Sequence, residues 1–199
     1  MVIEMKEFRM MSESMNFVAG YIKKISKELD SENINKLINQ ITGAKKIFLI
    51  GAGRSGFEAR AFAMRLMHLG FDVHVVGEAT APVPTYEDLV IIISGSGDTK
   101  SIIDLGVNIK DIGRPKMAVV TTKKNSPLVE ISGIVIIIPV MIEDIDKDLR
   151  ECFLPMGTLF EVVVHVFLDA IISELKYRTG TTEAKMKDRH MLSECVGII

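Results

Sequence analysis

Two glycine- and hydroxyl-rich turns, each directly after an apolar run, constrain the fold of this 199-residue chain more than any other feature. The sequence GAGRSG (51–56) follows the apolar run 46–50, and SGSGDT (94–99) follows the run 89–93. Glycine lets the backbone bend tightly and lets a ligand approach its N–H groups, and serine and threonine add hydroxyl donors. A helix that begins just past each turn aims its positive end at an anion. Two such turns on one parallel sheet predict a cradle for a phosphate group.

Apolar runs and amphipathic segments alternate along most of the chain, and each type predicts a different element. We expect strands at 46–50, 71–76, 89–94, 116–121 and 134–138. We expect helices at 55–69, 99–111 and 155–177, with one helical turn starting at Ser126 in the short link 122–133. Strands made almost entirely of Ile, Val and Leu are covered on both faces. The pattern therefore predicts a doubly wound, three-layer α/β sheet with its ligand beyond the carboxyl ends of the strands.

Additional helices are expected at both ends of this sheet domain. Apolar residues at 3-4 spacing from 8 to 29 predict a helix that packs either on its own domain or on a neighbouring subunit. A second helix is expected over 33–41, stopped by Gly43. The predicted division is N-terminal helices for packing or oligomerisation at 1–43, the sheet domain at 44–180, and a tail helix at 181–199.

The charge and hydropathy patterns exclude two classes of partner. The formal net charge is −2, so no strong basic field favours a nucleic acid. The apolar stretch 153–172 approaches the ~20 residues of a membrane span. Glu161, His165 and Asp169 interrupt it at steps of four, which is typical of a buried helix with one polar stripe. We therefore expect neither a nucleic-acid-binding protein nor a membrane protein.

We expect structural roles for both cysteines and for three of the four histidines. Cys152 and Cys195 form no CxxC pair and no metal-ligand cluster, so we expect reduced thiols, no metal site and a cytoplasmic protein. The N-terminus lacks the apolar region of a signal peptide. We interpret His68 as a packing or interface residue, and His74 and His165 as structural histidines.

The first turn also matches the dinucleotide fingerprint GxGxxG, and its strand–turn–helix context fits. Glu78, just after the second expected strand, lies where a ribose-binding acid is found in such folds. A dinucleotide site does not require the second turn, whereas one phosphate held by two adjoining loops does. A single phosphate is thus favoured, and a dinucleotide or no ligand at all remain the alternatives.

The phosphate hypothesis has named donors and a structural alternative for each. The hydroxyl candidates are Ser55, Ser94, Ser96 and Thr99, and the glycines beside them are Gly53, Gly95 and Gly97. Serine and threonine are also preferred helix caps, which is the alternative for Thr99 above all. Arg54 can pair with phosphate through its forked donors or stand as an exposed loop charge.

These motifs, with AFAMRLMHLGF (61–71) and PMGTLFE (155–161), resemble the sugar isomerase (SIS) domain family, and within it the 6-phospho-3-hexuloisomerases. The resemblance covers about residues 46–170, with a matching Arg189-His190 near the C-terminus. It implies a flavodoxin-like, five-stranded parallel sheet, a homotetramer and no cofactor. The implied reaction interconverts 3-hexulose 6-phosphate and fructose 6-phosphate through a cis-enediol. The resemblance places that step in ribulose monophosphate metabolism, which fixes formaldehyde or, in reverse, supplies pentose phosphates.

The same resemblance implies a role for individual residues. Ser55, Ser94, Ser96 and Thr99 would hold the phosphate, and Glu161 would be the base that moves the proton. The structural alternative to a catalytic role is that Glu161 is simply one residue of the polar stripe with His165 and Asp169. Glu78 is the second candidate after Glu161, with binding of sugar hydroxyls as its expected role.

The tail is implied to bring His190 to the site of an adjacent subunit as an acid or base. The family-like Arg-His-Ala-Asn-Leu-Glu reads RHMLSE at 189–194 here, so the tail departs from the pattern after the histidine. Three rival functions remain: an isomerase for arabinose 5-phosphate, a non-catalytic sugar-phosphate regulator, and a nicotinamide-dependent dehydrogenase.

Overall fold

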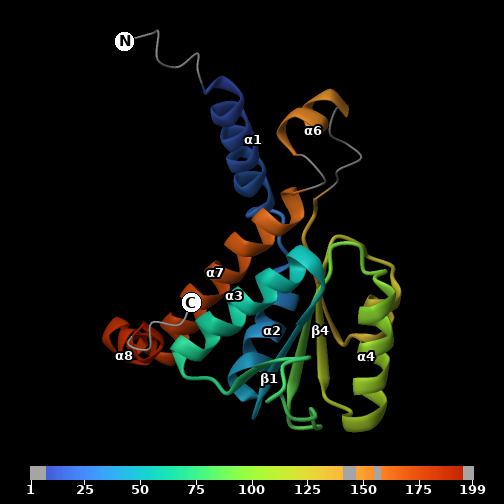
Figure 1. Ribbon diagram of the computed structural model, residues 1–199, viewed down its shortest axis with the longest axis vertical. Helices are drawn as coiled ribbons and strands as arrows, with labels where there is room; N and C mark the ends of the chain where they lie inside the picture. The colour runs from blue at the N-terminus through green and yellow to red at the C-terminus, as the bar shows by residue number, and fades with distance from the viewer. Residues whose placement is uncertain (1–7, 141–146, 155–157, 195–199) are drawn as a thin grey trace.

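Five parallel strands form one sheet in the order β2-β1-β3-β4-β5 (Figure 1). The computed structural model describes residues 8–140, 147–154 and 158–194. Its strands are β1 Ile47–Gly51, β2 Val73–Val75, β3 Leu89–Ile93, β4 Lys116–Thr121 and β5 Ile134–Ile137. This is the flavodoxin-like strand order, so the three-layer α/β prediction is confirmed. Only β2 is clearly shorter than expected, because this edge strand pairs with β1 alone and over three residues.

Each strand contributes alternate side chains to two separate cores, because successive residues of a strand point to opposite faces. In β1, Ile47 and Leu49 face one core, and Phe48 and Ile50 face the other. The central strand β3 is fully buried along its whole length. Both faces of the sheet are therefore covered, as its near-continuous apolar sequence predicts.

Helices cover the two faces as the doubly wound pattern requires. One face packs against α2 (Ser31–Gly43), α3 (Gly53–Leu69) and α7 (Leu159–Thr179). The opposite face packs against α4 (Lys100–Gly113) and the short α5 (Pro127–Ile131). The chain leaves β1 toward β2 through α3 and leaves β3 toward β4 through α4, on opposite sides of the sheet (Figure 1). The switch in strand order thus lies between β1 and β3, where such folds bind their ligands.

Three more helices lie outside these layers: α1 (Arg9–Ile25), α6 (Lys147–Phe153) and α8 (Glu183–Glu194). The C-terminal half of α1 packs on the chain's own core, where Ile25 is buried. Phe8, Met11 and Met15, near its start, are exposed. The seven-residue α6 is not expected from the sequence. The ring of Phe153, at its end, packs on that of Phe17 on α1, with the ring centroids 5.6 Å apart.

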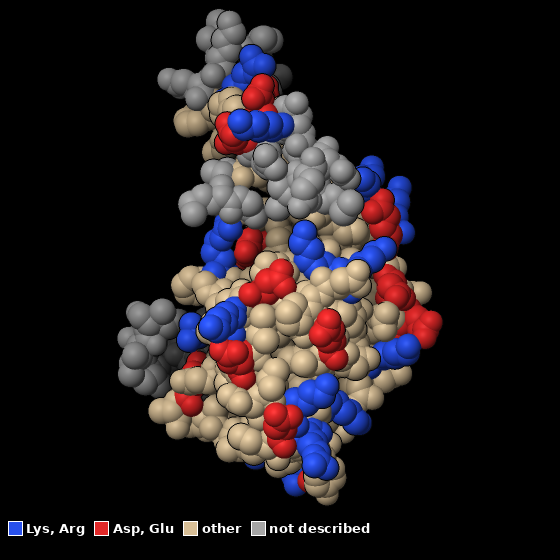
Figure 2. All heavy atoms as spheres, turned by 90° about the vertical axis from the view of Figure 1, so that its right-hand side faces the viewer, with Lys and Arg blue, Asp and Glu red and all other residues tan. Residues whose placement is uncertain are grey.

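The face of the molecule that carries α4 bears charges of both signs. Lys and Arg side chains are interspersed with Asp and Glu among uncharged residues there (Figure 2). Among the described residues, no helix is both long enough and apolar enough to cross a membrane.

Candidate active site

The two glycine turns lie side by side at the carboxyl edge of the sheet. β1 and β3 are neighbours in parallel register, with Gly51 opposite Ile93, so each turn leaves the sheet at the same level. Helix α3 begins at Gly53, within the first glycine turn, and α4 begins at Lys100, directly after the second. Both helices therefore direct their N-terminal N–H groups toward the space beyond these strand ends.

Close backbone packing explains why the first turn is rich in glycine. A Cβ at Gly51 would lie 2.6 Å from the carbonyl oxygen of Ser55, and one at Gly56 would lie 2.9 Å from that of Gly51. Gly53 has a left-handed φ of 54°. Ala52, the N-cap of α3, offers no side-chain hydrogen bond to the helix. The N-terminus of α3 therefore has no side-chain cap, and Ser55 lies buried in its first turn.

The second turn uses its serine oxygens internally and leaves their hydrogens to donate. The Oγ atom of Ser94 accepts from the Gly97 N–H at 3.2 Å, and that of Ser96 accepts from the Asp98 N–H at 3.2 Å. A hydroxyl that accepts a hydrogen bond still has its own hydrogen to donate. Both serines are thus arranged as hydroxyl donors to an acceptor such as a phosphate oxygen.

Thr99 is the N-cap residue of α4, and its side chain makes no capping hydrogen bond. Capping was the structural alternative for this threonine, and its hydroxyl does not fill that role. Like α3, α4 therefore starts with N–H groups that no side chain of the N-cap residue satisfies. The structure brings Thr99 to the same edge of the sheet as the serines. Its contact with phosphate stays a prediction.

Glu161 lies next to the first glycine turn. It is in the first turn of α7, its side chain is 16% exposed, and its Oε2 lies 3.6 Å from Nη2 of Arg54. Within the described part of the chain, that Oε2 atom is buried and has no hydrogen-bond partner. The carboxylate is therefore held beside the predicted phosphate site and paired with Arg54, in a position where a carboxyl group can serve as a base.

The neighbouring Phe160 couples this helix to the second turn. Its ring occupies the space that a side chain at Gly95 would need, with a Cβ there lying 2.8 Å from the ring. Gly95 therefore permits close contact between the SGSGDT turn and the start of α7. Residues 155–157, the first part of the PMGTLFE motif, lie outside the described residues.

Glu78 has a looser connection with this site. It follows β2, which neighbours β1, and it is exposed, with Oε1 at 3.8 Å from Nε of Arg60 on α3. The structure gives no contact between Glu78 and either glycine turn. Its role toward sugar hydroxyls stays a prediction.

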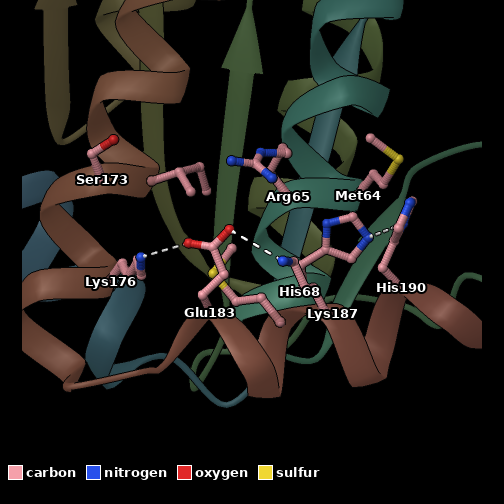
Figure 3. Close-up of a pocket in the computed structure, with 10 residues that line it drawn as sticks. Met64, Arg65, His68, Ser173, Lys176, Glu183, Lys187 and His190 are labelled. Atoms are coloured by element: carbon pink, nitrogen blue, oxygen red, sulfur yellow. Dashed lines mark hydrogen bonds and ion pairs between the residues drawn. The ribbon is translucent and has the colours of Figure 1, made fainter.

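His190 lies at the far end of α3, away from the glycine turns. Its Nδ1 is 3.1 Å from Nε2 of His68, and Arg189 donates to the His68 carbonyl oxygen at 2.9 Å. His68 is about 20 Å along the α3 axis from Ser55, at 1.5 Å per residue. The two histidines line a pocket of about 420 Å³ between α3, α7 and α8 (Figure 3). His190 therefore cannot reach the Glu161 site of its own chain in this arrangement.

The histidine pair predicts a loss of stability below neutral pH. Burial lowers the pKa of His68, with the nearby charges of His190 and Arg65 adding to the effect. The folded state therefore keeps His68 neutral, while the unfolded chain protonates it near pH ~6.5. Its contribution to stability is complete above that pH and decreases as the pH falls below it.

Urea unfolding of wild type and His68→Gln between pH 7.5 and 5 measures this contribution. We expect the free energy of unfolding of wild type to fall more steeply toward pH 5 than that of the variant. His190→Gln removes one neighbouring charge but not the burial, so it should flatten the slope only in part. Parallel slopes for wild type and His68→Gln would contradict the prediction.

Two residues that contact the site were not predicted from the sequence. Thr121 and Thr122, at the end of β4, donate their hydroxyls to the carbonyl oxygen of Gly95 at 3.1 and 2.9 Å. The sequence shows only that they end an expected strand; their contact with Gly95 follows from the position of β4 beside β3 in the sheet. Among the described residues, no group of three or more His, Cys, Asp or Glu side chains is arranged to hold a metal ion.

Comparison with known proteins points to one family. A family model described as the SIS domain matches residues 40–163. A 3-hexulose-6-phosphate isomerase of Methanocaldococcus jannaschii is 41% identical over 157 residues, covering 79% of this chain and 82% of the relative. One of the same name from Bacillus subtilis is 36% identical, covering 85% and 95%.

A solved structure agrees with these sequence matches. A crystal structure of a Methanococcus jannaschii protein, for which the molecular function of 3-hexulose-6-phosphate isomerase was inferred, has a TM-score of 0.78. It is 37% identical in sequence, and the similarity covers 89% of this chain and 97% of that one. With the matching turns, strand order and family model, the chain belongs to the SIS domain family.

Proposed function

We propose that this protein is a cofactor-independent isomerase that interconverts D-arabino-3-hexulose 6-phosphate and fructose 6-phosphate. The observation that carries the proposal is the largely buried carboxylate of Glu161, which pairs with Arg54 of the first glycine turn at 3.6 Å. The names of the M. jannaschii and B. subtilis relatives supply the substrate. A regulator that only binds sugar phosphates has no need for such a carboxylate.

In this proposal the phosphate anchors the substrate between the ends of β1 and β3. Ser55, Ser94, Ser96 and Thr99 donate hydroxyl hydrogen bonds to the phosphate oxygens, and the N-termini of α3 and α4 favour its negative charge. Gly53, Gly95 and Gly97 let the backbone approach the phosphate. Binding at this end of the sugar fixes the distance between the phosphate and the reacting carbons, so that the reacting part faces Glu161.

Glu161 then moves the proton between C2 and C3. Its carboxylate takes the proton from C2 of the 3-hexulose while the C3 carbonyl oxygen receives a proton from the acid assigned to His190, which gives the cis-enediol. The same carboxyl group returns its proton to C3 while the C2 hydroxyl gives its proton back to that histidine and becomes the carbonyl of fructose 6-phosphate. Arg54, 3.6 Å from Glu161, contributes positive charge near the developing enediolate. Glu78 is assigned to the sugar hydroxyls.

His190 takes part through another subunit. Because it lies at the opposite end of α3 from the glycine turns, its predicted acid or base role requires a homo-oligomer, here a homotetramer. The exposed start of α1, with Phe8, Met11 and Met15, offers apolar surface for such contacts. We assign residues 1–43 and 181–199 to assembly and 44–180 to the site, in a cytoplasmic enzyme of ribulose monophosphate metabolism and formaldehyde fixation.

Subunit mixing tests this arrangement. Glu161→Gln and His190→Gln are each expected to be strongly impaired as pure proteins. After subunit exchange at equal amounts, hybrid sites that combine an intact Glu161 with an intact His190 should recover up to about a quarter of the wild-type activity. Hybrid oligomers that form but show no recovered activity would contradict a shared site.

A coupled assay tests the reaction itself. Wild-type protein is given 3-hexulose 6-phosphate, and fructose 6-phosphate is converted by auxiliary enzymes to a product that reduces a nicotinamide cofactor. Turnover supports the proposal. Turnover of arabinose 5-phosphate alone would replace the substrate, and binding of both sugars without turnover would favour a regulator. A nicotinamide cofactor that binds directly to the purified protein would favour the dehydrogenase.

A further inference from the structure

We propose that Thr121 and Thr122 are positioning residues that preset the SGSGDT turn for phosphate, an inference that rests on the proposed function. The backbone carbonyl of Gly95 accepts three hydrogen bonds from the end of β4. The donors are the Thr121 hydroxyl at 3.1 Å, the Thr122 hydroxyl at 2.9 Å and the Thr122 N–H at 3.1 Å. A carbonyl oxygen has two lone pairs, so three donors saturate it and fix its direction.

The direction of this carbonyl determines where the next N–H points. The peptide bond between Gly95 and Ser96 is planar and trans, so its C=O and N–H point to opposite sides. With the carbonyl held toward β4, the Ser96 N–H points away from β4. The Ser96 N–H is therefore held in one direction before any ligand binds. A tight anion site requires such preorganised donors.

The donor role of Thr121 is also determined by its surroundings. Its side chain is fully buried, and its Oγ1 accepts the N–H of Lys123 at 3.3 Å. The Thr121 oxygen thus accepts from Lys123, and its hydroxyl hydrogen is donated to the carbonyl oxygen of Gly95. Thr122 donates to the same oxygen, so two adjacent threonines share one task.

The β4–α5 loop supports the same turn at a second point. Ser126, the N-cap of α5, lies so close to Gly97 that a Cβ at that position would overlap its side chain. The SGSGDT turn is thus backed on the β4 side by Thr121, the last residue of β4, and by Thr122 and Ser126 of the β4–α5 loop. None of these three residues is a predicted phosphate ligand. Their expected effect on phosphate binding is therefore indirect, through the position of the turn.

Thr122→Val and Thr121→Val remove one hydroxyl each with little change in shape. We expect each to weaken the binding of inorganic phosphate, measured by calorimetry, by about fivefold, and the double variant by about twentyfold. KM for the sugar phosphate should rise in parallel, while kcat changes less than twofold because Glu161 is untouched. Thr122→Ser keeps the hydroxyl and should restore wild-type phosphate affinity.

Thr42→Val is the matched control. Thr42 donates its hydroxyl to backbone carbonyl oxygens of Ile38 and Asn39 within α2, so the variant loses the same kind of bond far from the turns. It should lower thermal stability without changing phosphate affinity.

The outcomes separate this inference from the proposed function. Unchanged phosphate affinity in both single valine variants would overturn the positioning role, even in an active isomerase. Should wild type bind phosphate but fail to isomerise, the proposed function would fall, while weaker binding in the valine variants would still establish positioning. If the double variant does not fold, the single variants and Thr122→Ser decide the question.

Discussion

Replacing Glu161 with glutamine is expected to lower kcat roughly 10³-fold, because a positioned general acid or base contributes about 10² to 10⁴. Glutamine keeps the size of the side chain but cannot take up the C2 proton. KM should change less than threefold, since the phosphate is held by the two turns. In deuterated water, wild type should place deuterium at C3 of fructose 6-phosphate, and the variant should lose this exchange along with turnover.

Asp169→Asn is the matched control for that experiment. Asp169 is a carboxylate on the same polar stripe of α7, two turns further on, and it pairs with Arg65 at 3.2 Å. If Glu161 were merely one more member of this stripe, the two variants would behave alike. We expect Asp169→Asn to keep near-wild-type kcat. A Glu161→Gln protein that retained more than a tenth of the wild-type kcat would remove Glu161 as the base.

The sheet and its switch point are predictable from the sequence because burial on both faces leaves a simple pattern. β3 is apolar at every position, and its register with β1 follows from the shared edge at which both strands end. The two glycine turns then lie side by side at the carboxyl ends of β1 and β3. Their serines and Thr99 were predictable as a set for the same reason.

The rest depends on tertiary contacts that leave little local signal. α6 has seven residues, and its packing comes from Phe153 against Phe17, which are far apart in the sequence. The location of His190 depends on how α8 folds back along α3. Thr121 and Thr122 look like ordinary strand-end residues until β4 is known to lie beside β3. Glu161 was found by resemblance, and its burial beside Arg54 becomes evident only when α3 and α7 are placed together.

Gly97→Ala is expected to damage the phosphate site more than any substitution at its hydroxyl anchors. Gly97 has a left-handed φ of 68°, a conformation that costs an alanine roughly 1–2 kcal/mol. A Cβ there would also overlap the side chain of Ser126, whose Oγ caps α5 by accepting the Val129 N–H at 3.4 Å. We expect the turn to move to relieve this overlap and to lose the bond from the Gly97 N–H to Ser94.

We expect Gly97→Ala to weaken binding of inorganic phosphate roughly 10- to 100-fold, as strain of about 1–3 kcal/mol at a binding turn implies. Gly180→Ala is the control for backbone strain, because Gly180 has a similar φ of 64° at the end of α7 with no atom within 4 Å of an added Cβ. It should lose about 1 kcal/mol of unfolding free energy in urea and keep its phosphate affinity. Adding Ser126→Gly to Gly97→Ala removes the overlap but not the strain, so it should restore part of the affinity. Phosphate affinity within twofold of wild type in Gly97→Ala would show that the second turn does not hold the anion.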